Sequence, residues 1–319
     1  MSGLSYLEAI VVGALQGVSE LFPISSLGHS VLLPALIGGR WARDLNVSAP
    51  ESPYLAFIVG LHVATALALL VFFWRDWVRI LTGLFTSLRD RRVRTPDQRL
   101  GWLLVLGTIP VGLTGLLLEH LFRTTLGRPL PAAAFLMLNA LVLTAGERLR
   151  RPAPVPAMAG AEPPGTEADP EPSSATLSGE ASEEASAEAD ERLSAMPTRS
   201  AFLIGAAQSL ALLPGISRSG VSMVAGLRLG LSHAEAARFS FLLATPVILA
   251  AGVLKVPDLF GPLGAGIGGQ VLAGSVAAFL SALLAVRFLT RYFEARTLYP
   301  FAAYCAIVGA GSFLWLIFR

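Results

Sequence analysis

Charged residues are scarce in this sequence of 319 residues. Asp, Glu, Lys and Arg together make up 14% of the chain, whereas hydrophobic residues make up 54%. Soluble domains typically carry about a quarter charged residues, so this composition excludes an ordinary soluble domain. It favours an integral membrane protein, which has the bilayer itself as a partner.

Cysteine is nearly absent too, because the chain has only Cys305, within an apolar run. One cysteine excludes an intrachain disulfide framework and a cysteine-rich metal site. The sequence also lacks a phosphate-binding P-loop and a dinucleotide-binding glycine fingerprint. Nothing in it indicates a nucleic-acid partner, and no pattern predicts an oligomeric state.

Six apolar runs are long enough, or nearly so, to be membrane-spanning helices. A helix needs about 20 residues to cross a hydrocarbon core of ~30 Å. The predicted spans cover residues 54–74, 101–118, 130–146, 236–256, 266–287 and 299–318. These runs predict an all-α integral membrane protein.

Two further apolar segments, residues 6–37 and 201–230, are interrupted midway. Residues 22–26 read Phe-Pro-Ile-Ser-Ser, and residues 214–220 read Pro-Gly-Ile-Ser-Arg-Ser-Gly. A helix facing lipid does not tolerate such a break, because its freed N–H and C=O groups find no hydrogen-bond partners there. Broken helices at membrane depth occur where they line a cavity, so both segments are predicted to be hairpins beside one.

The two interrupted segments resemble each other in sequence. With an offset of 192 and no gap, eight of 18 positions are identical. The pairs are Gly13 and Gly205, Ala14 and Ala206, Gln16 and Gln208, Leu21 and Leu213, Ile24 and Ile216, Ser25 and Ser217, Gly28 and Gly220, and Ser30 and Ser222. Paired, interrupted segments in the two halves of a chain indicate a binding site near the bilayer midplane.

The distribution of arginines predicts the orientation of the chain in the membrane. Seven arginines follow the first span within residues 75–99, which places that loop in the cytoplasm. The arginines at 148–151 and 287–296 fall on the same side only if both hairpins are re-entrant. Each half then has one re-entrant hairpin and three transmembrane helices. Because three is odd, the two repeats have inverted topology, and both termini are predicted to lie outside.

Residues 151–199 differ from the rest of the chain. Ten of the 22 acidic residues lie between Glu162 and Glu191, and large apolar side chains are rare there. Such a segment buries too little surface to offset its ordering entropy. We predict a disordered acidic linker between a first membrane repeat at residues 1–150 and a second at residues 200–319. The membrane part is basic, which suits anionic lipids or a phosphorylated substrate.

The first hairpin carries groups suited to catalysis. Glu20 lies within a membrane segment, where a carboxylate costs about 2.5 kcal/mol or more unless it is paired, so such residues are usually functional. Gln16 lies one helical turn earlier on the same face. Ser25, Ser26 and His29 follow the break. These groups suit acid–base, nucleophilic or metal-assisted chemistry, and the alternative is a purely structural pairing of Glu20 with His29.

The second hairpin is cationic instead. Arg218 occupies the position equivalent to Ser26, and its neighbours are small: Gly215, Ser217, Ser219 and Gly220. Small residues let backbone N–H groups approach an anion, and a guanidinium binds phosphate oxygens through two parallel hydrogen bonds. A snorkelling arginine, which is the alternative, would not need such neighbours. We therefore expect a diphosphate to bind between the Glu20 hairpin and the Arg218 hairpin.

Three motifs together resemble the undecaprenyl pyrophosphate phosphatase family, which is associated with bacitracin resistance. They are Gln16-x-x-x-Glu20, the stretch Pro23-Ile24-Ser25-Ser26-Leu27-Gly28-His29, and the stretch Pro214-Gly215-Ile216-Ser217-Arg218-Ser219-Gly220. They occur in the family's order and cover both membrane halves but not the linker. Leu27 stands where the family usually has Thr, and Gln16 leaves only one carboxylate in the first motif.

This resemblance implies hydrolysis of undecaprenyl pyrophosphate to undecaprenyl phosphate and inorganic phosphate, which recycles the lipid carrier for cell-wall synthesis. It also implies a divalent cation, Mg²⁺ or Ca²⁺, and an active site that opens to the outer side of the cell membrane. By the same resemblance, Glu20 with Gln16 would hold the metal or activate water. Ser26 and His29 would be the nucleophile and its acid–base partner, although Ser26 as a phosphate ligand stays open. Arg218 and its neighbours, with Ser25, would bind the phosphate.

The alternative function is a transporter or flippase for a polyprenyl phosphate carrier. Inverted repeats with broken helices also describe secondary transporters, in which Glu20 and His29 would relay protons. Arg218 together with Ser26 favours hydrolysis, since hydrolysis needs a phosphate-binding group and a nucleophile. A non-catalytic scaffold would leave three polar motifs at membrane depth without a purpose.

Overall fold

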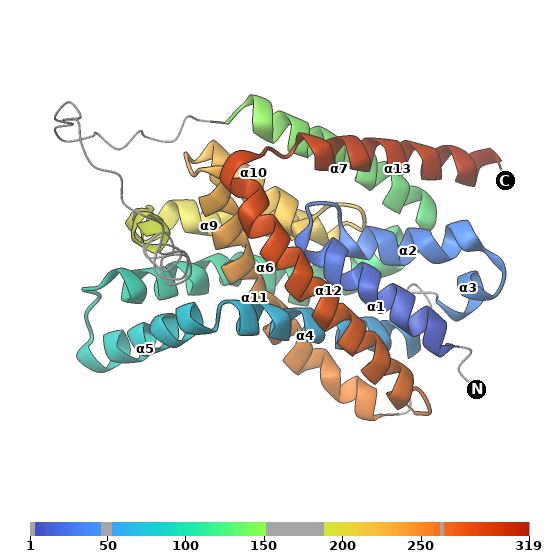
Figure 1. Cartoon of the computed structure of the whole chain (residues 1–319), viewed down its shortest axis with the longest axis horizontal. Helices are drawn as coiled ribbons and strands as arrows, with labels where there is room; N and C mark the ends of the chain where they lie inside the picture. Colours follow the sequence, from blue (N-terminus) through green and yellow to red (C-terminus); the bar gives the residue numbers. More distant parts are fainter. Residues whose placement is uncertain (1–3, 46–52, 151–187, 262–264, 319) are drawn as a thin grey trace, which may run out of the picture.

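The protein is described by a computed structural model over residues 4–45, 53–150, 188–261 and 265–318, and every regular element in these ranges is a helix (Figure 1). The first half contains α1 (Tyr6–Leu21), α2 (Ser26–Ile37), α3 (Gly39–Asp44), α4 (Pro53–Phe72), α5 (Trp74–Asp90), α6 (Pro96–Leu126) and α7 (Pro129–Arg148). The second half contains a short helix at residues 188–195, then α9 (Thr198–Ala207), η1 (Gln208–Leu212), α10 (Arg218–Arg228), α11 (His233–Lys255), η2 (Val256–Phe260), α12 (Gly268–Ala295) and α13 (Tyr299–Phe318).

The helices that could cross a membrane match the predicted spans. Within the described residues, α6 (over Pro96–Leu118), α7, α11, α12 and α13 are each long and apolar enough. The sixth predicted span, residues 54–74, is α4, which meets α5 at a bend of 87°. The arginine-rich segment after α4 is therefore mostly helical rather than a loop. The prediction of an all-helical protein with several membrane spans is confirmed.

The first hairpin is a helix broken where the sequence predicted. α1 starts with a capping box, in which Ser5 and Glu8 bond each other's backbone N–H groups, and it ends at Leu21. Pro23 follows in the break. Ser25 then caps α2, since its hydroxyl accepts a hydrogen bond from the N–H of Gly28, over 3.2 Å. A side-chain cap of this kind replaces the missing helical partners at a helix start.

The second hairpin repeats this construction. α9 tightens into the 3-10 turn η1, the chain leaves the helical conformation at Leu213, and α10 begins at Arg218. Ser217, the equivalent of Ser25, caps α10 by accepting from the N–H of Gly220 over 3.1 Å. Both predicted interruptions are therefore capped turns between two helices.

Each hairpin packs backbone against backbone on a long helix of the other half. A Cβ atom added to Gly13 of α1 would lie 2.2 Å from the carbonyl oxygen of Gly274 in α12. A Cβ atom added to Gly205 of α9 would lie 2.0 Å from the carbonyl oxygen of Gly107 in α6. Gly13 and Gly205 are equivalent in the sequence repeat, so the same small residue permits the same close approach in both halves.

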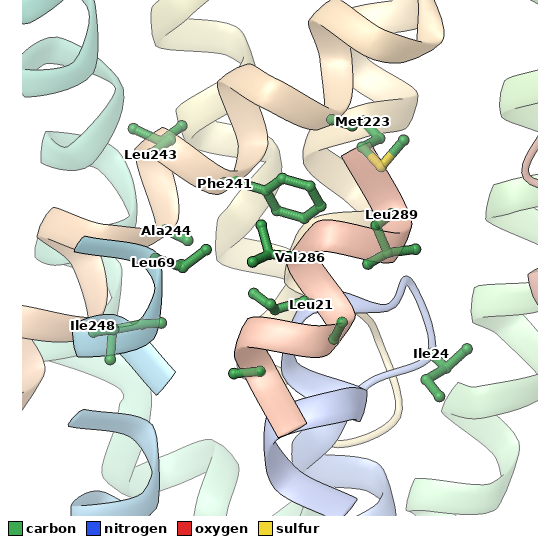
Figure 2. Packing of buried hydrophobic residues seen from close by; sticks show 14 of the residues in the cluster. Leu21, Ile24, Leu69, Met223, Phe241, Leu243, Ala244, Ile248, Val286 and Leu289 are labelled. Atoms are coloured by element: carbon green, nitrogen blue, oxygen red, sulfur yellow. The ribbon is translucent and has the colours of Figure 1, made fainter. Parts of the chain in front are cut away.

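Buried apolar side chains fill the space between the hairpins and the spans. Figure 2 shows Leu21, at the end of α1, beside Val286 of α12, with Phe241 of α11 beyond them. All three side chains are almost completely buried. Because lipid is as apolar as these side chains, close packing rather than removal from water holds membrane helices together. This packing fixes the end of α1, and Glu20 on it, against the central helices.

The predicted disordered linker, residues 151–199, needs a correction at its end. Residues 151–187 lie outside the described residues, but residues 188–195 form a helix. Leu193 and Met196 are buried there, and Asp190 is only 3% exposed. Asp190 pairs with Arg238 of α11 through two hydrogen bonds of 2.8 and 2.9 Å, and with Arg79 of α5 over 2.9 Å. Composition missed this helix because the buried carboxylate is satisfied by arginines far away in the sequence.

Candidate active site between the two hairpins

The tips of the two broken helices contact each other directly. The backbone N–H of Gly215 donates to the hydroxyl of Ser25, over 3.1 Å. In the other direction, the hydroxyl of Ser219 donates to the carbonyl oxygen of Phe22, over 3.1 Å. Backbone groups freed by each break are thus satisfied by the opposite hairpin, which is how irregular backbone is tolerated at membrane depth.

Asn139 of α7 joins the same two tips from outside the hairpins. Its amide nitrogen donates to the carbonyl oxygen of Pro23, and its amide oxygen accepts from the N–H of Ser217, both over 3.0 Å. The side chain is completely buried. The sequence analysis did not single it out, although a lone Asn in the apolar run 130–146 was the available signal, since buried amides often link membrane helices.

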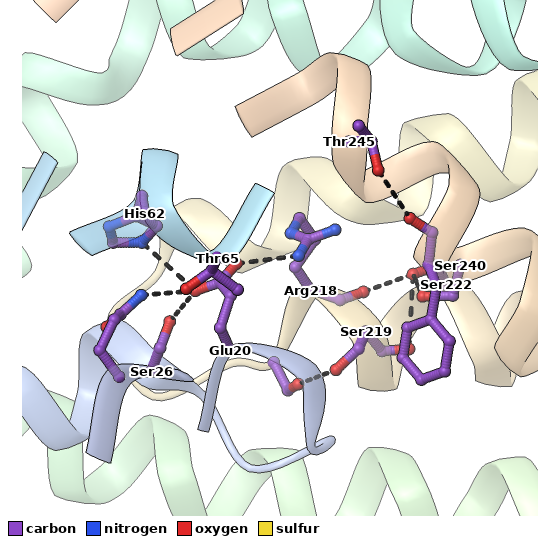
Figure 3. Close-up of polar contacts among 12 residues, drawn as sticks. Glu20, Ser26, His62, Thr65, Arg218, Ser219, Ser222, Ser240 and Thr245 are labelled. Atoms are coloured by element: carbon purple, nitrogen blue, oxygen red, sulfur yellow. Dashed lines mark hydrogen bonds and ion pairs between the residues drawn. The ribbon is translucent and has the colours of Figure 1, made fainter. Parts of the chain in front are cut away.

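Glu20 and Arg218 form the centre of the site (Figure 3). One guanidinium nitrogen of Arg218, Nη2, donates to Glu20 Oε1 over 2.8 Å. The Glu20 side chain is 5% exposed and that of Arg218 is 12% exposed. The structure therefore brings together the acidic and the cationic group that the sequence assigns to opposite sides of one site. A buried pair of this kind needs further hydrogen bonds to offset desolvation of its charges.

The second oxygen of Glu20 supplies those bonds. Glu20 Oε2 accepts from the amide nitrogen of Gln16 over 3.0 Å and from the hydroxyl of Ser26 over 2.5 Å. His62 of α4 lies on the same oxygen, with Nε2 at 3.3 Å. Figure 3 shows Ser26 and His62 converging on the Glu20 carboxylate from different elements. The carboxylate is thereby fixed in place by four groups.

His62, like Asn139, is a residue of this site that the sequence analysis did not assign to it. It lies in the predicted span 54–74, without a motif around it. Its Nδ1 lies 2.8 Å from the carbonyl oxygen of Ile58, so this nitrogen carries a hydrogen and donates it. That bond orients the ring with Nε2 toward Glu20. Only the packing of α4 beside α1 reveals the contact, although a histidine within a membrane span was itself a signal.

His29 faces away from Glu20. Its Nδ1 lies 2.7 Å from the carbonyl oxygen of Ser25, and its Nε2 lies 2.8 Å from the hydroxyl of Tyr304 in α13. Both ring nitrogens are therefore engaged outside the Glu20 and Arg218 pair. The alternative considered from the sequence, a pairing of Glu20 with His29, is not what the structure shows.

The small residues beside Arg218 hold its loop. Gly215 has a φ of +115°, and a Cβ atom there would lie 2.4 Å from the carbonyl oxygen of Ala132, so only glycine fits. The Ser217 hydroxyl caps α10 by bonding Gly220, and it lies 3.0 Å from the hydroxyl of Ser219. These groups position the Arg218 loop, and binding of substrate by them stays a prediction.

Two buried atoms of the site have no hydrogen-bond partner in the described part of the chain: Oε1 of Gln16 and Nη1 of Arg218. Buried polar atoms are nearly always paired, so each of these needs an explanation. The first is an acceptor and the second a donor, so they suit ligands of opposite charge. A cation fits beside Gln16, and an anion fits beside Arg218.

The oxygen atoms of Gln16 and Glu20 suit the divalent cation expected from the sequence. Mg²⁺ and Ca²⁺ prefer oxygen ligands, and Mg²⁺ is commonly bound by one or two carboxylates together with substrate phosphates. Among the described residues, no three His, Cys, Asp or Glu side chains lie close enough to hold a metal on their own. A cation here would therefore need additional oxygen ligands, such as phosphate oxygens or water.

Comparison with known proteins agrees with this geometry. The undecaprenyl-diphosphatase of Mycobacterium avium (strain 104) is 68% identical over 317 residues, which is 99% of each chain. The undecaprenyl-diphosphatase 1 of Frankia casuarinae is 54% identical over 362 residues, covering 97% of this chain and 98% of the relative. The profile of the family described as bacitracin resistance protein BacA matches residues 9–311. This multi-pass membrane protein belongs to the BacA family.

Proposed function

We propose that this protein hydrolyses undecaprenyl diphosphate to undecaprenyl phosphate and inorganic phosphate, and so recycles the lipid carrier for cell-wall synthesis. The observation that carries the proposal is the Arg218 guanidinium, which binds Glu20 through Nη2 while Nη1 is buried and has no hydrogen-bond partner among the described residues. A phosphate oxygen is the ligand that this nitrogen lacks, because guanidinium and phosphate form strong, charge-assisted hydrogen bonds. The names and high identity of the relatives support the same reaction.

Ser26 is the attacking group in this proposal. Its hydroxyl donates to Glu20 over 2.5 Å, so the carboxylate accepts the proton as the oxygen attacks the terminal phosphorus. The bond between this phosphorus and the bridging oxygen breaks, and undecaprenyl phosphate leaves. Water then releases the phosphate from Ser26. Arg218 stabilises the charge that develops on the phosphate oxygens, which is the main contribution to phosphoryl transfer.

His62 is a positioning residue in this scheme. It contacts Glu20 rather than the expected position of the phosphate, and its Nδ1 bond to Ile58 fixes the ring. The resemblance made His29 the acid–base partner of Ser26, whereas in this proposal Glu20 accepts the proton of Ser26 and His62 contacts Glu20. His29, bonded to Ser25 and Tyr304, supports the start of α2, on which Ser26 lies.

A divalent cation, Mg²⁺ or Ca²⁺, is part of the proposed active form. Gln16 Oε1 and the Glu20 carboxylate would hold it, and the unpartnered amide oxygen of Gln16 supports this assignment. When bound, the cation would neutralise charge on the diphosphate. Glu20 then has two neighbours of positive charge, the cation and Arg218, which favours binding of a strongly anionic substrate between the two hairpins.

We also propose that the two halves are inverted repeats and that the site and both termini face the outer side. The matching capped turns at Ser25 and Ser217 support the repeat, as do the matching close approaches of Gly13 and Gly205. The arginines of α5 and of the α12 end support the orientation, because cytoplasmic segments are enriched in arginine. In this topology the lipid carrier reaches the hairpin tips laterally from the bilayer.

A phosphate-release assay tests the proposed function. Purified protein in detergent, given a polyprenyl diphosphate, is expected to release phosphate with Mg²⁺ or Ca²⁺ present and to stop with EDTA. Glu20→Ala is expected to abolish release, whereas Glu294→Ala, an exposed carboxylate on α12, is the matched control. No release with either cation, from protein that still binds the lipid, would favour the flippase alternative. Full activity in EDTA would show that phosphate release does not require a divalent cation.

A further inference from the structure

The exposed face of α12 carries an unbroken apolar ridge. It consists of five side chains spaced four residues apart, each between 51% and 70% exposed: Leu272, Val276, Leu280, Leu284 and Phe288. Residues four apart form a ridge that winds around the helix by about 40° per step, and 16 residues of helix extend about 24 Å. The ridge is therefore nearly as long as the ~30 Å hydrocarbon core, and a lipid chain can lie along it.

The ridge ends at a hollow lined by three arginines. This hollow of about 470 Å³ is formed by the last turns of α12 and the residue after it: Leu284, Arg287, Phe288, Arg291, Tyr292, Ala295 and Arg296. A second hollow of about 380 Å³ adjoins it and shares Ala295 and Arg296; it adds Arg150, His233 and the carboxylate of Glu294. His233 lies 2.8 Å from Glu147, so the guanidinium groups that gather where the apolar ridge stops are those after α7 and at the end of α12.

The three arginines of the first hollow have no carboxylate within 4.0 Å among the described residues. In contrast, Arg79, Arg192 and Arg238 each pair with an acidic side chain. An excess of arginine on one side of the membrane explains cations at the end of α12. It does not explain why three of them, unpaired, line one hollow together with Leu284 and Phe288. Unpaired guanidinium groups beside an apolar wall match a phosphate attached to a hydrocarbon chain.

The hollow also lies close to the first hairpin. Phe288 stacks on Phe22, with ring centroids 5.9 Å apart and planes 4° from parallel. Phe22 is in the break itself, and its carbonyl oxygen accepts the hydroxyl of Ser219. A ligand in the hollow would therefore contact Phe288, which stacks on Phe22, and would contact neither Glu20 nor Arg218.

We propose that the hollow at the end of α12 binds the phosphate head group of an anionic bilayer phospholipid, whose chain lies along the ridge of α12. A bilayer phospholipid is favoured over the substrate because the ridge is exposed along its whole length, where such lipids are the permanent neighbours. The site does not depend on the proposed hydrolysis, since Arg287 and Arg291 lie outside the catalytic pair. Arg287 and Arg291, one helical turn apart, are the principal head-group ligands.

Native mass spectrometry of the full chain tests this site. Protein released from nanodiscs of phosphatidylcholine mixed with phosphatidylglycerol is expected to retain phosphatidylglycerol preferentially. Arg287→Gln with Arg291→Gln is expected to lower that affinity about tenfold or more, a change of at least about 1.4 kcal/mol, because charge-assisted hydrogen bonds to the phosphate are lost. Arg92→Gln with Arg94→Gln, exposed residues after α5 that remove the same charge, is the control and is expected to bind like the wild type.

Three results would overturn the proposal. The first is equal retention of phosphatidylcholine and phosphatidylglycerol by the wild-type protein, a result that does not depend on whether any variant folds. Equal loss of phosphatidylglycerol in both double variants would show that retention depends on the net charge of the protein and not on Arg287 and Arg291. Displacement of phosphatidylglycerol by equimolar polyprenyl phosphate, or by inorganic phosphate alone, would assign the hollow to the lipid carrier or to a free anion. Phosphate release by the same samples, measured in parallel, reports separately on the proposed hydrolysis.

Discussion

Replacing Arg218 with Lys tests whether the two terminal nitrogens of its guanidinium bind different partners. In the structure Nη2 donates to Glu20 over 2.8 Å, whereas Nη1 is buried and has no partner within the part of the chain that the structure describes. Lys keeps one positive charge near Glu20 but has a single nitrogen, so it cannot bind the carboxylate and a phosphate oxygen with two separate groups. A hydrogen bond to a charged group is worth about 1.5–3 kcal/mol, so losing one in the transition state lowers kcat/KM by roughly 10- to 150-fold.

The assay is phosphate release from a polyprenyl diphosphate at saturating Mg²⁺, with kcat and KM determined for each variant. Arg228→Lys, at the exposed end of the same helix, is the matched control and is expected to behave like wild type. Thermal unfolding of Arg218→Lys is expected to stay close to wild type, because the charge beside Glu20 is retained. An Arg218→Lys enzyme within threefold of wild-type kcat/KM would refute the assignment of Nη1 to the phosphate.

Two further predictions concern the packing that positions the site. Gly205→Ala places a Cβ atom 2.0 Å from the Gly107 carbonyl oxygen, so it is expected to cost about 1–3 kcal/mol of stability. Gly112→Ala, which has open space around it, is the control and is expected to cost no stability. Equal melting temperatures for the two variants would contradict this packing. Asp190→Ala leaves Arg238 with one carboxylate fewer in a nearly buried position and is expected to cost about 3 kcal/mol. Glu188→Ala, two residues earlier and exposed, is its control, and equal denaturation midpoints for the two would show that the helix at 188–195 does not hold α11.

The hairpins were predictable because backbone chemistry leaves a signature in the sequence. Pro23, Ser25 and Ser217 mark the breaks, and the matching spacing of Gly and Ser shows that the two breaks are built alike. A carboxylate and a guanidinium at membrane depth must also find partners, which is why Glu20 and Arg218 were expected on one site. The structure brings the two groups together over 2.8 Å.

Contacts between distant elements were not predictable in the same way. Nothing within the sequence around His62 indicates which helix its ring faces, and the choice between His29 and His62 depends on the rotation of α2 and α4 about their axes. The structure directs His29 to Tyr304 and His62 to Glu20. Asp190 was missed for a related reason. Its segment has the composition of a disordered chain, and only the arginines of α5 and α11 make its burial favourable.

The two capped turns explain how a repeated sequence produces an asymmetric site. Ser25 and Ser217 each accept a hydrogen bond from the N–H three residues ahead, although the backbone differs at the cap, with a φ of +70° at Ser25 and −88° at Ser217. The next residue in each turn, Ser26 or Arg218, reaches the Glu20 carboxylate, over 2.5 and 2.8 Å. The two turns share the serine cap but differ in the residue after it. The Glu20 carboxylate therefore has a hydroxyl on one side and a guanidinium on the other. Those are the two groups that transfer of a phosphoryl group requires.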